Sequence, residues 1–142
     1  MNTKTLYKRL NKLKEHLEQI PIQQKFRLGA IILDKYGIPI SIGFNSYVKT
    51  HPVMLNFRSP KVDFGFGIDK ESKIFLHAEM DCLIKGLSKK SEWHTLIVAR
   101  IGADGELKLA KPCQGCSEML KGHFKNIYYT DNSGNLILMK SI

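Results

Sequence analysis

Two short segments of the chain carry residues whose types and spacing suit zinc chemistry. His77-Ala78-Glu79 stands at the start of one expected helix, and Cys113 and Cys116 stand at the start of another. Two cysteines three positions apart at a helix start can face one ion, and a helix dipole favours the thiolate form that binds metal. A histidine from a second helix start supplies a third ligand. Catalytic zinc sites commonly have three protein ligands and keep a fourth position for water.

Glu79 follows the histidine by two positions, which brings a carboxylate within reach of a water at that fourth position. Zinc can lower the pKa of a bound water from about 15.7 to near 7, and a neighbouring carboxylate can carry its protons. The pattern therefore predicts a hydrolytic zinc site. In this interpretation His77, Cys113 and Cys116 are metal ligands and Glu79 is catalytic.

Other uses of a Cys-x-x-Cys pair stay open. The pair also occurs in structural zinc sites and in redox sites, whereas an odd count of 3 cysteines argues against a disulfide framework. A closed structural site would need a fourth ligand, for which His123 and Cys82 are candidates. A redox pair would leave the His-Ala-Glu segment without a role.

The composition indicates which kind of chain must position these residues. Of its 142 residues, 43% are hydrophobic and 25% are charged, which is typical of a folded domain and excludes a disordered or fibrous chain. Apolar runs stay far below the ~20 residues of a membrane helix. The first residues lead directly into a helical pattern with no secretory leader. We therefore expect a single cytoplasmic domain over 1–142 that does not contact a membrane.

The periodicity of apolar residues predicts helices and strands in alternation. Leucines at helical spacing from Leu6 to Leu17 mark a basic N-terminal helix within residues 1–20, which Pro21 ends. Further helices are expected at 78–87 and 113–121, with Gly122 as a C-terminal stop. Strands are expected at 26–33, 38–44, 94–101, 126–130 and 136–139. Pro39 favours a sheet edge or a bulge for its strand.

The connections complete the expected fold. Four residues, 131–134, join the last two strands, and this joint is too short for a crossover helix, so the pair should be antiparallel. Residues 45–76 have no clear periodicity and are interpreted as an irregular loop on the substrate side. The order predicts an α/β fold with a mixed five-stranded sheet that helices cover.

With these motifs in place, the sequence resembles the zinc-dependent cytidine/deoxycytidylate deaminase superfamily, in its compact phage or bacterial form. His-x-Glu followed by Pro-Cys-x-x-Cys is the signature of zinc deaminases. The resemblance implies a three-layer α/β/α fold and a hydrolase that turns cytosine into uracil with release of ammonia. The antiparallel C-terminal hairpin expected from the short joint departs from the members of the family that have a helix between the last two strands. The resemblance also implies that Asn45, at the end of the second strand, contacts the substrate sugar and that the backbone at Ala78 holds the base.

The charge bears on the substrate. The net charge is +9, and residues 1–27 hold seven basic and two acidic side chains, which favours anionic partners. Our leading hypothesis is a free pyrimidine nucleotide such as dCMP. Single-stranded DNA or RNA is the alternative, and a non-catalytic nucleic-acid-binding module with structural zinc is the second alternative. The resemblance also implies a homo-oligomer.

Overall fold

The computed structural model describes residues 2–20, 27–45, 78–111, 120 and 122–139. The expected loop beyond Asn45, most of the helix expected at 113–121 and the three expected zinc ligands therefore lie outside the described residues. The described elements are α1 (Thr3–Glu18), β1 (Arg27–Leu33), β2 (Pro39–Phe44), α3 (Ala78–Lys85), η2 (Leu87–Glu92), β3 (Thr95–Ile101), β4 (Leu107–Lys108), β5 (Asn126–Thr130) and β6 (Leu136–Leu138).

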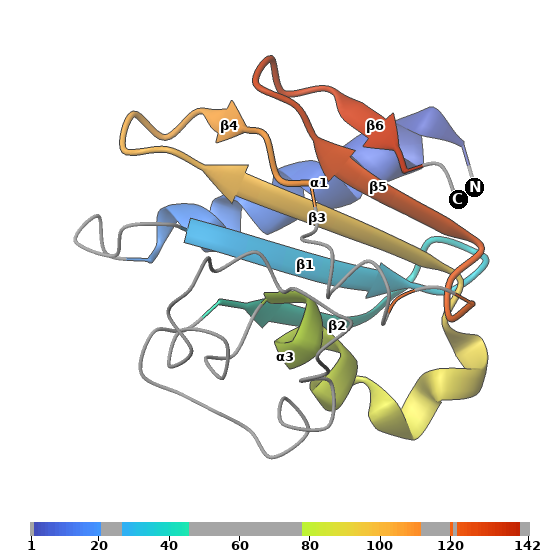
Figure 1. The fold of residues 1–142 in the computed structure, drawn as a ribbon. Helices are drawn as coiled ribbons and strands as arrows, with labels where there is room; N and C mark the ends of the chain where they lie inside the picture. Colours follow the sequence, from blue (N-terminus) through green and yellow to red (C-terminus); the bar gives the residue numbers. More distant parts are fainter. Residues whose placement is uncertain (1, 21–26, 46–77, 112–119, 121, 140–142) are drawn as a thin grey trace, which may run out of the picture.

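The strands form one mixed sheet in the order β2-β1-β3-β5-β6, with β4 paired to β3 (Figure 1). β1 is antiparallel to both β2 and β3, and β5 is antiparallel to β6. β3 and β5 are parallel. The expected mixed α/β architecture and the antiparallel C-terminal pair are thereby confirmed.

The sheet has six strands rather than the expected five. The additional strand, β4, is only two residues long, and so short a segment carries no alternating pattern by which a sequence could reveal it. A turn folds it back onto the end of β3, with Gly105 at φ +79° donating to the Gly102 carbonyl. Glycine adopts this left-handed conformation without the steric cost of a side chain.

Pro39 occupies the kind of position that its chemistry requires. It begins β2, which lies at one end of the strand order, and the β1–β2 register shifts between Ile32 and Leu33 where Leu33 pairs with Pro39. An edge position and an irregular register both spare the sheet the hydrogen bond that proline cannot donate. The expectation from the sequence is confirmed.

Helices cover both faces of the sheet, so β1 is buried on both sides. In Figure 1, α1 lies behind the sheet and α3 lies in front of it. Ala30 and Ile32 point into the cluster under α3, whereas Ile31 and Leu33 point into the cluster under α1. This alternation is the two-residue period of a strand. It produces the three layers that the sequence led us to expect.

α1 begins with a side-chain cap and buries a single leucine face. The Asn2 side chain accepts from the Thr5 amide at 2.9 Å, which satisfies one of the free N–H groups at the helix start. The buried face consists of Leu6, Leu10, Leu13 and Leu17. The helix ends at Glu18, slightly before the expected boundary at Pro21.

α3 is shorter than expected, because it ends at Lys85 rather than at residue 87. Gly86 follows, and the chain continues as the 3-10 helix η2. Glycine is a weak helix former, which accounts for the change at this point. Gly122 has φ +81° directly after the segment expected to be helical, as suits a C-terminal stop.

Candidate functional site

The carboxyl ends of three strands meet at one end of the sheet. β3 and β5 run in parallel, and β1 pairs antiparallel with both β2 and β3, so β2, β3 and β5 all end on the same side. Open α/β sheets bind ligands outside the carboxyl ends of their strands. Asn45 directly follows β2 and therefore lies at this end.

α3 brings the expected catalytic carboxylate to the same end. The helix runs antiparallel to β2, since Gly43 adjoins Ala78 and Cys82, whereas Ser41 adjoins Gly86. Its first residues therefore lie beside the end of β2. Ala78 is 1% exposed and Glu79 is 6% exposed, which places both in the interior at the helix start.

Gly43 allows α3 to touch the strand backbone to backbone. A Cβ at this position would lie 2.3 Å from the Cys82 nitrogen and 2.7 Å from the Ala78 carbonyl oxygen. No side chain fits at such distances, because backbone atoms of a helix cannot rotate away. A glycine within a strand pattern often marks this kind of close approach. The start of α3 therefore has one fixed distance from β2.

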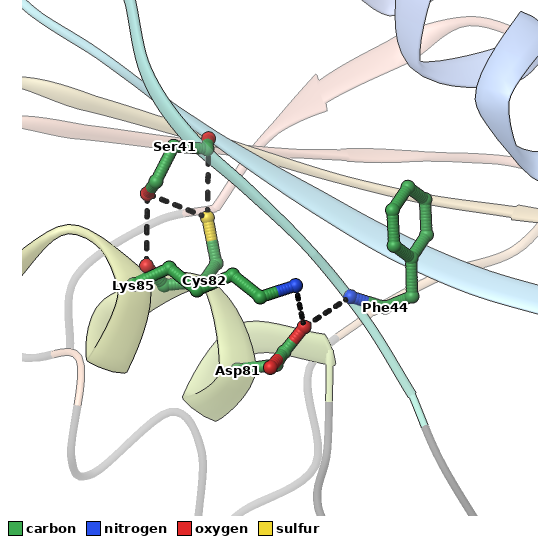
Figure 2. A network of polar contacts seen from close by, with 5 residues as sticks. All are labelled: Ser41, Phe44, Asp81, Cys82 and Lys85. Atoms are coloured by element: carbon green, nitrogen blue, oxygen red, sulfur yellow. Dashed lines mark hydrogen bonds and ion pairs between the residues drawn. The ribbon is translucent and has the colours of Figure 1, made fainter.

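Hydrogen bonds between Ser41 of β2 and Cys82 of α3 add to the backbone contact at Gly43. The Ser41 hydroxyl donates to the Cys82 carbonyl at 2.8 Å, and the Cys82 Sγ lies 3.4 Å from the Ser41 carbonyl (Figure 2). Burial raises the pKa of the Cys82 thiol to about 12, and its hydrogen bond to Ser41 only partly offsets that effect. The thiol is enclosed in the core and directed at the Ser41 carbonyl, as suits a packing role.

A second polar group joins the first turns of α3 to the end of β2. The Asp81 Oδ2 atom accepts from the Phe44 amide at 2.9 Å and lies 2.8 Å from the Lys85 Nζ atom (Figure 2). No sequence motif marks Asp81 as a functional residue, because its partner is a backbone amide 37 positions earlier in the chain.

Asn45 closes the pairing of β1 with β2. Its Oδ1 atom accepts from the Leu28 amide at 3.0 Å, and its own amide donates to the Leu28 carbonyl at 3.1 Å. The side chain therefore has a structural task at the strand end. Its contact with a substrate sugar stays a prediction.

The expected zinc ligands are outside the described residues, but the described residues near them in the chain lie at the end of the sheet where β2 and β5 finish. His77 immediately precedes Ala78, the first residue of α3. Ala110 is buried, and its amide donates to the Thr130 carbonyl, at the carboxyl end of β5, at 2.9 Å. Leu120 is buried in the same cluster as Ala78 and Ala110. Within the described ranges no group of three His, Cys, Asp or Glu side chains could hold a metal ion.

His123 lies far from this end of the sheet. The Lys125 amide, just beyond it, donates to the carbonyl of His94, which precedes β3. The His123 ring lies edge-on to Trp93, with 6.2 Å between the ring centroids. This is the end opposite to Asn45, where the parallel strands begin. His123 is therefore poorly placed to complete a site beside Ala78.

A scan of protein-family models gives no match for this sequence, and neither does a search of curated proteins. Among solved structures, the chain is similar to the cytidine deaminase of Mycobacterium leprae, with 15% identity and a TM-score of 0.49 over 91% of this chain and 92% of that one. It is similar to the cytidine deaminase of Mycobacterium tuberculosis, with 19% identity and a TM-score of 0.45 over 84% of this chain and 82% of that one. These are likenesses of chain path at low identity, and no residue role is taken from them.

Proposed function

We propose that this chain is a zinc-dependent hydrolytic deaminase that converts a cytosine amino group to a carbonyl on a free pyrimidine nucleotide of the dCMP type. One observation carries the proposal beyond the motif. Glu79 is 6% exposed in the first turn of α3, at the end of the sheet where β2, β3 and β5 finish. A carboxylate held there, two positions after His77, is suited to carry protons for a reaction at that end.

The donor set fits zinc. One imidazole and two thiolates are ligands that zinc prefers, and we propose that His77, Cys113 and Cys116 hold the ion. The attachment of both segments supports this assignment, because His77 adjoins the start of α3 and Ala110 adjoins the carboxyl end of β5. When bound, zinc supplies a water whose pKa is near 7.

The side chains then divide the work of hydrolysis. Glu79 accepts a proton from the attacking water as the water oxygen bonds to the amino-bearing carbon, and it delivers protons to the ring and to the departing amino group. The carbon–nitrogen bond breaks and ammonia leaves, so one water is consumed for each uracil formed. We assign Asn45 to the substrate sugar and the Ala78 backbone to the base.

The positive charge supports an anionic substrate. The chain carries a formal charge of +9, and such an excess attracts nucleotides and other phosphates. A nucleoside monophosphate is the smallest substrate whose negative charge this positive chain would attract. It does not need the basic N-terminal helix for binding, so that helix could serve solubility or assembly.

A specific feature of α1 favours the second candidate, a deaminase that acts on single-stranded DNA or RNA. Lys4, Lys8 and Lys12 are all exposed at a spacing of four residues and form one stripe on the helix. Tyr36 is 72% exposed in the turn between β1 and β2, at the end of the sheet opposite Asn45, and offers a ring for a base of the strand far from the reacting one. Replacing Lys8 and Lys12 with alanine should then weaken strand binding and reduce its salt dependence, whereas turnover of a monomer should not change.

The third candidate, a binding module with structural zinc, has less support. Such a site needs a fourth protein ligand. The Cys82 side chain is buried and its Sγ is directed at the Ser41 carbonyl of β2, and His123 lies at the opposite end of the sheet. Other parts of our proposal concern the whole molecule: a single domain over 1–142, a homo-oligomer to be tested by light scattering, and a cytoplasmic location. No helix of the described residues is both long and apolar enough to cross a membrane.

Mass spectrometry of a mixed pool tests the proposal. The purified, zinc-loaded protein is incubated with cytidine, deoxycytidine, CMP, dCMP and a cytosine-bearing single strand, and deamination shifts a product by about one mass unit. A shift confined to a monomer supports the nucleotide enzyme. A shift confined to the strand supports the second candidate. If the protein holds one zinc ion per chain and no compound in the pool changes mass, both the nucleotide enzyme and the single-strand deaminase are contradicted.

A further inference from the structure

Asp81 connects the helix that carries Glu79 to the strand that ends at Asn45. We propose that Asp81 is a positioning residue for Glu79, which acts by anchoring the first turns of α3 to the Phe44 amide. This inference rests on the function proposed above, because it assigns Asp81 a role in a reaction that Glu79 performs.

The Phe44 amide is a donor at the open edge of the sheet. Amide groups alternate in direction along a strand, and the Asn45 amide points to β1, where it donates to Leu28. The Phe44 amide therefore points away from β1, and β2 is the last strand in the described sheet order. Asp81 supplies an acceptor there, 2.9 Å from the amide nitrogen. The carboxylate thus occupies the place where a further strand would pair.

Lys85 supports the carboxylate from the next turn of the helix. Its Nζ lies 2.8 Å from the same Oδ2 atom that accepts from Phe44. The Asp81 side chain is 14% exposed, and the Lys85 side chain is 52% exposed. A charged acceptor makes a stronger hydrogen bond than a neutral one, and the lysine compensates the charge that burial isolates from water. Figure 2 shows both donors converging on this oxygen.

The bond acts on Glu79 through a short helix. α3 has eight residues and depends on tertiary contacts, because isolated helices of that length are marginal. Glu79 is two positions before Asp81, in the turn that this bond holds. Asn45 has its own bonds to Leu28 and does not depend on Asp81. Loss of the anchor should therefore shift Glu79 while the strand end stays in place.

The helix should still fold without the anchor, because Ser41 provides a second one. Its hydroxyl donates to the Cys82 carbonyl at 2.8 Å, and Gly43 keeps the backbones in contact. Asp81→Ala is therefore expected to fold and to bind one zinc ion per chain. A displacement of a reacting group by about 1 Å can cost on the order of 100-fold in rate. We expect kcat to fall by about that factor, with a much smaller change in KM.

Four variants separate placement from charge. Asp81→Asn and Lys85→Ala both remove the ion pair but leave an oxygen that can accept from Phe44, so each should lose less than about fivefold in kcat. Asp81→Glu keeps the charge but displaces the acceptor by one methylene. It should lose more kcat than Asp81→Asn, although its net charge matches that of the original chain. Asp81→Ala should lose the most.

Amide hydrogen exchange gives a readout that does not depend on turnover. The Phe44 amide should exchange roughly tenfold faster or more in Asp81→Ala, and it should stay protected in Asp81→Asn and Lys85→Ala. Fast exchange of Phe44 with an unchanged kcat would overturn the positioning role and leave the proposed function standing. Slow exchange in Asp81→Ala would overturn the anchor itself. A zinc-loaded original chain that deaminates nothing would overturn the proposed function and the role of Asp81 in it, whether or not the exchange data support the anchor.

Discussion

Leucine side chains of α1 close one face of the sheet, whereas on the other face α3 adds a backbone contact and polar bonds with β2 to its apolar cluster. Under α1, Leu13 and Leu17 pack over Gly29, and their methyl groups lie about 3 Å from the position of a Cβ there. Under α3, the atoms near the equivalent position at Gly43 belong to the helix backbone. Ser41 and Asp81 bond α3 directly to β2. The polar bonds of α1 lead elsewhere: Arg9 donates to the Gly37 carbonyl in the β1–β2 turn, and Tyr7 accepts from the Leu136 amide of β6.

The two faces therefore contribute differently: contacts under α1 mainly stabilise the fold, whereas contacts under α3 also fix the position of Glu79. Burial of leucine side chains is strong but non-directional, so the α1 face can adjust by rotamer changes. Backbone contact and hydrogen bonds together define one distance and one orientation between α3 and β2, so α3 cannot shift without losing some of these contacts. The expected catalytic residue lies on the second face. Changes on the two faces should therefore affect different measurements.

Glu79→Gln should have the largest effect. The amide keeps the shape of the side chain but cannot carry a proton, so kcat for deamination should fall by about 10²- to 10⁴-fold. Zinc content and melting temperature should stay close to those of the original chain. Equal activity in the variant, measured by product mass, would remove Glu79 from the mechanism.

Leu13→Ala is the counterpart on the α1 face. Leu13 is 0% exposed, and its truncation should lower the free energy of unfolding by about 2–5 kcal/mol in urea titration. The folded fraction should keep its kcat, because Glu79, the proposed proton carrier, lies on α3 at the other face. A large fall in kcat at a temperature where the variant is fully folded would contradict the separation of the two faces.

Gly43→Ala and Gly29→Ala form a matched pair across the sheet. At Gly43 the new Cβ would meet backbone atoms at 2.3 Å and 2.7 Å, so α3 must move, at about 1–3 kcal/mol of stability and with a clear loss of kcat. At Gly29 it would meet the Leu13 Cδ1 at 2.9 Å and the Leu17 Cδ2 at 3.0 Å, which are flexible ends. We expect a smaller loss of stability and an unchanged kcat. The reverse ranking, in paired thermal and kinetic assays, would refute the comparison.

The smallest effect at neutral pH concerns the Cys82 thiol under α3, which changes the stability of the fold only in alkaline solution. The Cys82 thiol has a pKa of about 12 in the folded chain against an ordinary value of 9.0, so the unfolded chain releases this proton first. The contribution is complete below pH 9 and is lost as the pH rises toward 12, at up to about 1.4 kcal/mol per pH unit. Cys82→Ala removes this loss, so its unfolding free energy should fall less steeply than that of the original chain. Parallel slopes would show that the thiol is not buried in this way.

Much of the local structure could be predicted from the sequence. The leucine spacing located α1, the alternating and continuous apolar runs located β1, β2, β3, β5 and β6, and Pro39 marked an edge strand. These features depend on side-chain chemistry repeated within one element, which a single chain displays directly. The expected zinc ligands and Glu79 come from a motif of the same local kind, and their roles stay predictions.

Other features could not be predicted because they depend on contacts between distant segments. Strand β4 is too short for any pattern, and the order β2-β1-β3-β5-β6 is set by which surfaces bury each other. In the sequence, Gly43 is only a small residue two positions before Asn45, and Asp81 is only an acidic residue in an expected helix. Neither position indicates the contact that the residue makes.

The sequence by itself determined most of the helices and strands, the candidate ligands and the candidate proton carrier, since each is encoded within a few neighbouring residues. Only the tertiary structure decided that α3 lies backbone to backbone on β2, that Asp81 reaches the Phe44 amide, and that the Cys82 thiol is buried in the core. Those facts follow from distances between parts of the chain that are far apart in sequence, and such distances exist only once the sheet has formed.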